Sequence, residues 1–307
     1  MNSPAMSKER LRSVIRWRRR WDIAFGVVGL LAMSVGILTL VALFAQMVAE
    51  GFPRLTAEFF TNFPSRRASQ AGIVSAWVGS VLVMLVTAFF AIPVGIASAI
   101  YLEEYARKNW FTDVIEINIT NLAGVPSIVY GLLALGLFVY TFGFGQSILS
   151  AGLTLALLIL PIVIVATREA LRAIPQTVRE AAYACGATKW QVCSDHLVPY
   201  GMPGILTGVI IGLSRAIGET APVITIGALT FIAFLPPAPF SGDAGLFDWL
   251  MSPFTVMPIQ IFNWTSRPDP AFHANAAAAS LVLVVLTLGM NATAIWLRYR
   301  LRKNLKW

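Results

Sequence analysis

The chain has 307 residues, of which 57% are hydrophobic and 12% are charged, and its mean hydropathy is +0.72. Because about a quarter of the residues in an ordinary soluble domain are charged, this composition excludes such a domain and predicts an all-α, polytopic membrane protein. The formal net charge of +8 would suit nucleic-acid binding, but the positions of the basic residues favour membrane topology and no nucleic acid.

Six apolar runs are long enough to cross a bilayer, at roughly 22–48, 72–102, 118–140, 148–167, 204–234 and 276–297. With both termini inside, 18 of the 23 lysines and arginines fall in tails or inner loops, and four fall in outer segments. This asymmetry predicts six transmembrane helices with both termini in the cytoplasm. The expected parts are a basic cytoplasmic tail at 1–21, a six-helix domain at 22–297 with an inner loop at 168–203 and an outer segment at 235–275, and a basic tail at 298–307.

The first two predicted helices have no charge in their interiors. The run at 23–48 is uniformly apolar, which favours a peripheral anchor. The run at 72–102 contains Gly79, Ser80 and Gly95, small residues that let neighbouring helices approach closely. We therefore expect the second helix to pack against other helices.

The third helix opens with the polar sequence NITNLAGVPSIVYG at 118–131. Gly124 and Pro126 should loosen or break it, and irregular backbone at membrane depth is tolerated beside a cavity. Asn121, Ser127 and Tyr130 are therefore candidate residues of a substrate pathway. The alternative is that they only form hydrogen bonds between helices.

The inner loop at 168–203 is long and is not a low-complexity linker. Pro175, Gly186 and Pro199 predict two or three short helices in it. A compact amphipathic projection of this kind suits the docking of another protein. The alternative is a hairpin on the membrane surface that has no partner.

The fifth apolar run, 204–234, contains the sequence SRAIGETAP at 214–222. Gly204, Gly208 and Gly212 recur every four residues and give the helix one smooth face for close packing. Arg215 and Glu219 are also four residues apart, so they should lie one turn from each other and pair. Counted from Gly204, Arg215 lies about 16 Å along the helix, near the middle of the membrane.

An arginine at the centre of a membrane helix costs about 2.5–3.5 kcal/mol on insertion scales, so Arg215 needs a reason to be there. One reading is a buried ion pair with Glu219 that locks two helices together. The other is that Arg215 binds an oxyanion while Glu219 orients the guanidinium or balances its charge when the site is empty. Gly218 and Pro222 should weaken the helix just beyond the pair.

The outer segment at 235–275 is rich in proline and tryptophan. We expect one short interfacial helix in it, at 245–261. His273 is isolated in sequence and is expected at the surface rather than in a ligand set.

No catalytic motif is found in the sequence. It has no GxxxxGK phosphate loop, no zinc-type histidine pair and no GxSxG sequence. Cys185 and Cys193 fall in an inner loop and are expected as reduced thiols, and no metal site is expected. We therefore expect a non-catalytic protein without a cofactor of its own, so any energy from ATP must come from a partner.

Glu180, Ala181, Ala182 and Gly186, followed by Pro199, resemble the cytoplasmic EAA loop of permease subunits of ABC importers. His196 and Val198 depart from that pattern, which usually has Ile and Leu there. With the sequences NLAGVPSIVYG and SRAIGETAP, nearly the whole chain resembles the PstA-type permease subunits of phosphate-specific ABC importers.

This resemblance implies a type I ABC importer permease (MetI-like) fold in the bacterial inner (plasma) membrane. It also implies a PstC-like permease partner, two PstB-like ATPases that bind ATP and Mg, a periplasmic or lipid-anchored phosphate-binding protein, and surrounding membrane lipid. Residues 180–186 would sit in a cleft of the ATPase, and Arg215 and Glu219 would take part in phosphate passage. The alternatives are a permease for molybdate, tungstate or sulfate, or an anion transporter driven by an ion gradient.

Overall fold

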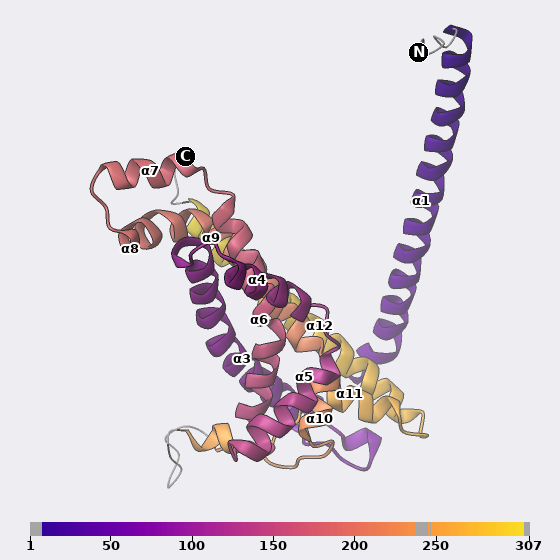
Figure 1. Ribbon diagram of the computed structural model, residues 1–307. Coiled ribbons are helices and arrows are strands. Elements are labelled where there is room, and N and C mark those ends of the chain that lie inside the picture. The colour runs from indigo at the N-terminus through magenta and orange to yellow at the C-terminus, as the bar shows by residue number, and fades with distance from the viewer. Residues whose placement is uncertain (1–7, 238–244, 246, 304–307) are drawn as a thin grey trace. The chain divides into compact units, whose positions relative to one another are not determined.

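The computed structural model describes residues 8–237, 245 and 247–303, and the regular elements in these ranges are all helices. The chain divides into two compact units, residues 1–50 and 51–307. In the first unit, α1 (Lys8–Gly51) is a single helix that begins well before the apolar run (Figure 1). The apolar side chains between Trp17 and Phe44 are exposed, which suits a helix that faces lipid.

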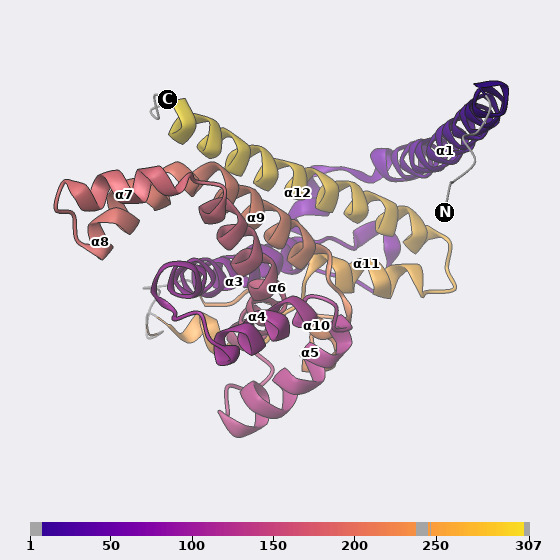
Figure 2. The same ribbon diagram turned by 45° about the horizontal axis from the view of Figure 1, so that its top comes forward.

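Five helices of the described chain are long and apolar enough to cross a membrane, or six if one bent pair counts as a single span. The spans after α1 are α3 (Val74–Ile100) with η3 (Tyr101–Tyr105), α6 (Ile148–Arg172), the continuous run α8 (Lys189–Gln191), η5 (Val192–Leu197) and α9 (Val198–Gly218), and α12 (Ala271–Lys303). Figures 1 and 2 show these helices of the second unit in two views, which differ by a turn of 45° about the horizontal axis.

The bent pair is the predicted third helix, and it breaks where the sequence indicated. α4 (Trp110–Leu122) is followed after four residues by α5 (Ser127–Ala134) and η4 (Leu135–Thr141), at an angle of 107°. Pro126 cannot donate a backbone hydrogen bond, so the helix cannot run through it unchanged. The hydroxyl of Tyr130 donates to the carbonyl of Leu122 at 2.8 Å and satisfies a backbone group that the break leaves free.

The predicted fifth helix at 204–234 is wrong at both ends. The helix begins at Lys189 and ends at Gly218, and a short α10 (Ala221–Ile226) follows after two residues. The proline ring of Pro222 would clash with the carbonyl of Gly218, which explains the end of α9. Gly227 then adopts φ +99°, and the described chain beyond it, up to residue 237, is not helical.

The inner loop is also shorter than the sequence indicated. α7 (Gln176–Ala184) follows Pro175, and Gly186 makes a turn with φ +84°. Pro199 does not separate two helices, because it directly follows the π-helical turn η5, whose altered hydrogen-bond pattern lets the run from Lys189 to Gly218 continue through it. We call residues 173–197 the inner knob. Its core is formed by Ile174, Ala182, Val192, Cys193 and Leu197 together with Leu171.

The two segments predicted to lie outside have small helices. They are η1 (Phe52–Arg54), α2 (Ala57–Thr61), η2 (Ala68–Gln70), η6 (Asp248–Met251) and α11 (Met257–Thr265). The described part of 235–275 has η6 and α11 in place of the single helix expected at 245–261. Pro258 stands in the first turn of α11 and sets where that helix begins. Arg54 Nε donates to Asn275 Oδ1 at 2.7 Å, which ties η1 to the start of α12.

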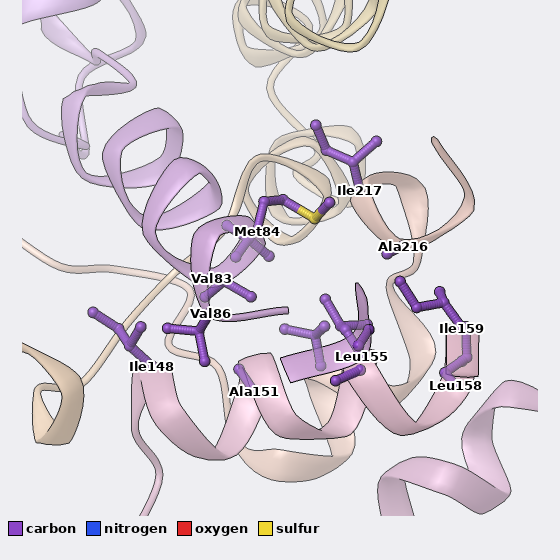
Figure 3. Close-up of a cluster of buried hydrophobic side chains, with 14 of the residues drawn as sticks. Val83, Met84, Val86, Ile148, Ala151, Leu155, Leu158, Ile159, Ala216 and Ile217 are labelled. Atoms are coloured by element: carbon purple, nitrogen blue, oxygen red, sulfur yellow. The ribbon is translucent and has the colours of Figure 1, made fainter. Parts of the chain in front are cut away.

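The main core of the second unit lies between α3, α6 and α9, and Figure 3 shows part of it. Side chains such as Val83, Leu155 and Ile217 meet there. The glycine face predicted on α9 is confirmed, because Cβ atoms at Gly204 and Gly208 would overlap Ala170 and Ala166 of α6. The backbones of α6 and α9 therefore approach closely, as small residues allow in membranes.

Gly208→Leu should separate α6 from α9 and destabilise the protein by about 1–3 kcal/mol, the usual cost of overpacking. The measurement is the thermal unfolding midpoint of the purified protein in detergent. Gly289→Leu on α12 is the matched control, since a Cβ at Gly289 would meet no atom within 4 Å. Equal midpoints for the two variants would contradict the close α6–α9 contact.

Candidate functional site

The Arg215–Glu219 pair lies at a helix end rather than in a helix centre. Arg215 is in the last turn of α9, about 26 Å along the helix from Val198. Glu219 follows Gly218 in extended conformation, and its Oε1 accepts from Arg215 Nε at 3.2 Å. The expected pairing is therefore confirmed, but the turn that brings the side chains together is the break in the helix.

The pair is partly open to the outside of the chain. The Arg215 side chain is 39% exposed and that of Glu219 is 18% exposed. A cation in the last turn of a helix is stabilised by the partial negative charge of that terminus. Among the described residues Arg215 makes its hydrogen bond through Nε, which leaves its two terminal guanidinium nitrogens able to donate to an anion.

The space beside Glu219 is too small for an oxyanion. Glu219 lines a cavity of about 10 Å³ together with Ser80, Met84 and Val223. This volume is at the lower limit for one water molecule. An anion bound by Arg215 would therefore lie on its exposed side, where this chain leaves the guanidinium uncovered.

The second helix break comes close to the pair through α5. α5 packs directly on α10, because a Cβ at Gly131 would overlap Thr225 and meet Pro222. Tyr130 is buried beside it, within electrostatic range of Arg215. Ser127 is half-buried one turn earlier, at the first position of α5. Two of the three polar residues predicted from the third helix therefore lie on the element that packs beside the charged pair.

Asn121 is in a different place. It is exposed and lines an open hollow of about 300 Å³ between α4 and α6, with Glu116, Glu169, Arg168 and Arg172. The hollow has as many carboxylates as guanidinium groups, so its lining does not favour an anion. The structure thus separates Asn121 from the residues around Arg215, and its part in a pathway stays a prediction.

The four residues predicted for docking lie on one end of the inner knob, on α7 and the turn after it. Glu180 and Ala181 are exposed on α7, and Gly186 is exposed in the turn. Ala182 is buried in the knob core against neighbours such as Val192. Ala182 therefore contributes to packing of the knob, whereas the other three are accessible to a partner.

Sequence reasoning missed the charged contacts that hold the knob. Arg179 Nη2 lies 2.7 Å from Glu104 Oε1, and both side chains are at most 10% exposed. Arg179 also donates to the carbonyls of Ile174 and Leu171. The ammonium of Lys189 lies over the Tyr105 ring, 4.8 Å from its centroid. Glu104 and Tyr105 are far in sequence from Arg179 and Lys189, so only the fold brings these pairs together.

A polar contact next to Arg215 was also missed. The Ser214 hydroxyl lies 2.6 Å from Asn291 Oδ1 and joins α9 to α12. Asn291 stands in an otherwise apolar stretch of α12, and this polar residue was the available signal. The contact fixes the rotation of α9 one residue before Arg215.

Among the described residues, no three His, Cys, Asp or Glu side chains are grouped so that they could hold a metal ion. Cys185 is exposed and Cys193 is buried, and both are free thiols.

The long apolar helices define a polytopic membrane protein, and comparison with known proteins gives its family. Residues 91–306, more than half of the chain, match the family described as the inner membrane component of binding-protein-dependent transport systems. The chain belongs to this family. It is consequently a multi-pass membrane protein of the ABC importer type.

Several relatives are similar over most of their length. The phosphate transport system permease protein PstA of Mycobacterium leprae is 35% identical, over 84% of this chain and 82% of that protein. PstA of Yersinia pestis is 31% identical, over 96% and 95%. The probable ABC transporter permease protein YqgI of Bacillus subtilis is 32% identical, over 92% and 96%.

Two solved transporters have the same fold at low identity. A chain of the MetNI methionine ABC transporter, in inward-facing conformations, aligns with a TM-score of 0.57 at 15% identity, covering 75% of this chain and 95% of its own. A chain of a bacterial ABC transporter that imports the acidic polysaccharide alginate aligns with a TM-score of 0.61 at 14% identity, covering 94% and 99%. The expected type I importer permease fold is thereby confirmed.

Glu219→Gln should change the free energy of unfolding by less than about 1 kcal/mol, because the pair is partly exposed to its surroundings. Glu104→Gln is the matched comparison, and it should cost about 3–5 kcal/mol because it leaves Arg179 buried and uncompensated. Unfolding midpoints of the purified variants measure both. An equally large loss of unfolding free energy in Glu219→Gln would favour the interpretation in which the pair locks helices together.

Proposed function

We propose that the chain is the permease subunit of an ABC importer for inorganic phosphate, and that Arg215 supplies a direct contact to the anion. The observation that carries the proposal is the guanidinium held through Nε by Glu219 at the break between α9 and α10, with its terminal nitrogens uncovered. The relatives named as phosphate transport permeases support phosphate over other oxyanions.

Arg215 suits a tetrahedral oxyanion for a chemical reason. Its guanidinium is permanently charged and can donate two parallel hydrogen bonds to one phosphate. When no anion is bound, Glu219 holds the guanidinium of Arg215 in place. It also offsets part of the positive charge, so a bound anion is held less tightly and can be released. The arginine is the more exposed member of the pair, 39% against 18% for Glu219, so an approaching ion meets the positive group first, which favours an anion over a cation.

A second permease subunit would complete the pathway. Next to the pair, residues of α10 and α11, such as Ile224, Ile261 and Phe262, line an open apolar groove of about 640 Å³. An apolar rim beside an uncovered guanidinium suits another membrane subunit, which we take to be PstC-like. Phosphate would then pass between the two subunits, with Arg215 facing the passage.

ATP hydrolysis would be supplied by two PstB-like ATPases, which bind ATP and Mg, since the chain itself carries no phosphate-binding loop. One ATPase would dock on the exposed residues Glu180, Ala181 and Gly186. From the knob, one continuous helix runs from Lys189 to Gly218 and includes Arg215. Movement of the docking site can therefore reach the charged pair through a single rigid element.

The orientation follows from the same assignment. With the knob in the cytoplasm, both termini lie inside and the small outer helices face the periplasm, where a phosphate-binding protein would deliver the anion. The membrane would be the bacterial inner membrane. Inhibition of labelled phosphate uptake by molybdate, tungstate or sulfate at equal concentration would favour another oxyanion, and uptake without any ATPase would favour an ion gradient.

Arg215→Gln should lower phosphate uptake by the whole complex at least about tenfold, the value of one charge-assisted hydrogen bond to an anion. Phosphate uptake by the Arg215→Lys complex should also fall, because lysine lacks the planar guanidinium that donates two parallel hydrogen bonds. Uptake of labelled phosphate into proteoliposomes is the measurement. Arg107→Gln, which removes an exposed arginine of the inner connection, is the matched control. Normal uptake with normal amounts of an Arg215→Gln complex would contradict the proposal.

Gly186→Trp should uncouple ATP hydrolysis from uptake by placing a bulky side chain on the docking face. Gly143→Trp is the matched control, because Gly143 also has a positive φ, of 70°, and open surroundings. The measurement is the ratio of phosphate transported to ATP hydrolysed. An unchanged ratio in an intact Gly186→Trp complex would place the docking site elsewhere.

A further inference from the structure

A network of ion pairs joins four helices, η3, α4, α6 and α7. Arg168 and Arg172 of α6 both pair with Glu103 of η3, at 3.4 and 2.9 Å, and both pair with Glu116 of α4. The adjacent Glu104 pairs with Arg179 of α7. Neighbouring residues of η3 therefore link the knob on one side to α4 and α6 on the other.

The centre of this network is shielded from solvent. Arg168 is 7% exposed and donates to both Glu103 and Glu116. Removing charges from water is costly, and a protein is strongly destabilised when one partner of a buried ion pair is lost, because the other charge stays buried without compensation. Contacts of this kind fix a geometry more than they add stability, so the arrangement of the helix ends is specified by these charges.

α4 depends on the network because its other contacts are few. Ile115 and Ile119 pack against a small buried cluster of Ala99, Leu102 and Ile164. The opposite side of α4 exposes large apolar side chains, including Trp110 and Ile117. Glu116 lies between these two surfaces, where its pairs with Arg168 and Arg172 hold α4 against α6.

We propose that Glu116 and Arg168 are positioning residues that make α4 move together with α6 and the inner knob, and so transmit ATPase docking to the broken span. This inference rests on the proposed function. Glu116 lies six residues, about 9 Å, before the end of α4, where the chain breaks. Beyond the break, α5 packs on α10 beside Glu219. The charged pair at Arg215 is thus reached by two routes, one through α9 and one through α4 and α5.

The two routes have different consequences. α9 carries Arg215 directly, whereas α5, which follows α4, carries Tyr130 within electrostatic range of Arg215. A motion that reached Arg215 through α9 alone would shift it relative to α5. With Glu116 bound to Arg168, both sides of the site move in step, and hydrolysis is coupled to transport.

Glu116→Gln tests the inference in the complete, reconstituted complex. We expect the ratio of phosphate transported to ATP hydrolysed to fall at least fivefold, with ATP hydrolysis retained. Glu169→Gln is the matched control, because Glu169 is 67% exposed and pairs with Arg172 of its own helix. The ratio should stay at the wild-type value in this control. A wild-type ratio in Glu116→Gln would overturn the inference.

A covalent replacement of the ion pair covers the case in which Glu116→Gln fails to assemble. The variant carries Glu116→Cys and Arg168→Cys, with Cys185→Ser and Cys193→Ala to remove the native thiols. In the assembled complex, a short bis-methanethiosulfonate linker joins the two new cysteines, and a reducing agent then cleaves the link to give the reduced protein for comparison. Linking should raise the transport ratio at least fivefold over the reduced protein. No gain, or a loss, on linking would contradict the positioning role.

The two proposals fail in distinguishable ways. If the wild-type complex takes up no phosphate, the proposed function fails. If the wild-type complex transports phosphate and Glu116→Gln keeps its coupling ratio, the positioning role fails alone.

Discussion

The backbone cannot leave its polar groups unpaired at membrane depth, and this constraint shapes the centre of the molecule. Two prolines nevertheless interrupt membrane helices here. Pro126 separates α4 from α5, and Pro222 ends α9 four residues earlier, at Gly218. α5 and α10, the segments just beyond the two breaks, pack on each other. The chain thus concentrates its irregular backbone at one place, and that place contains Arg215 and Glu219.

The break in α9 also explains how a charged pair is tolerated. At a helix end the arginine benefits from the helix dipole, and the extended residue Glu219 brings its carboxylate to Nε. The Arg215 side chain is 39% exposed, so this chain leaves part of the guanidinium uncovered. On the proposed function this subunit would form half of a pathway, and the other half would pack on the apolar groove beside the pair.

The features that the sequence predicted well depend on local chemistry: the break at Pro126, the glycine face of α9 and the pairing of Arg215 with Glu219. Helix ends were less predictable, because Pro222 ends a helix whereas Pro199, which directly follows the π-helical turn η5, does not interrupt one. The contacts of Arg168 with Glu103 and Glu116 join residues 65 and 52 positions apart. No local pattern indicates such partners, since they depend on how the helices pack.

Labelling of one engineered thiol tests most directly whether the break after α9 lies on the phosphate pathway. Gly218 is exposed, and a Cβ there would meet no atom within 4 Å, so Gly218→Cys fits without repacking. In a Cys185→Ser complex that still transports phosphate, a hydrophilic thiol reagent should label this residue, and saturating phosphate should slow the labelling several-fold. A labelling rate that phosphate leaves unchanged would contradict the account.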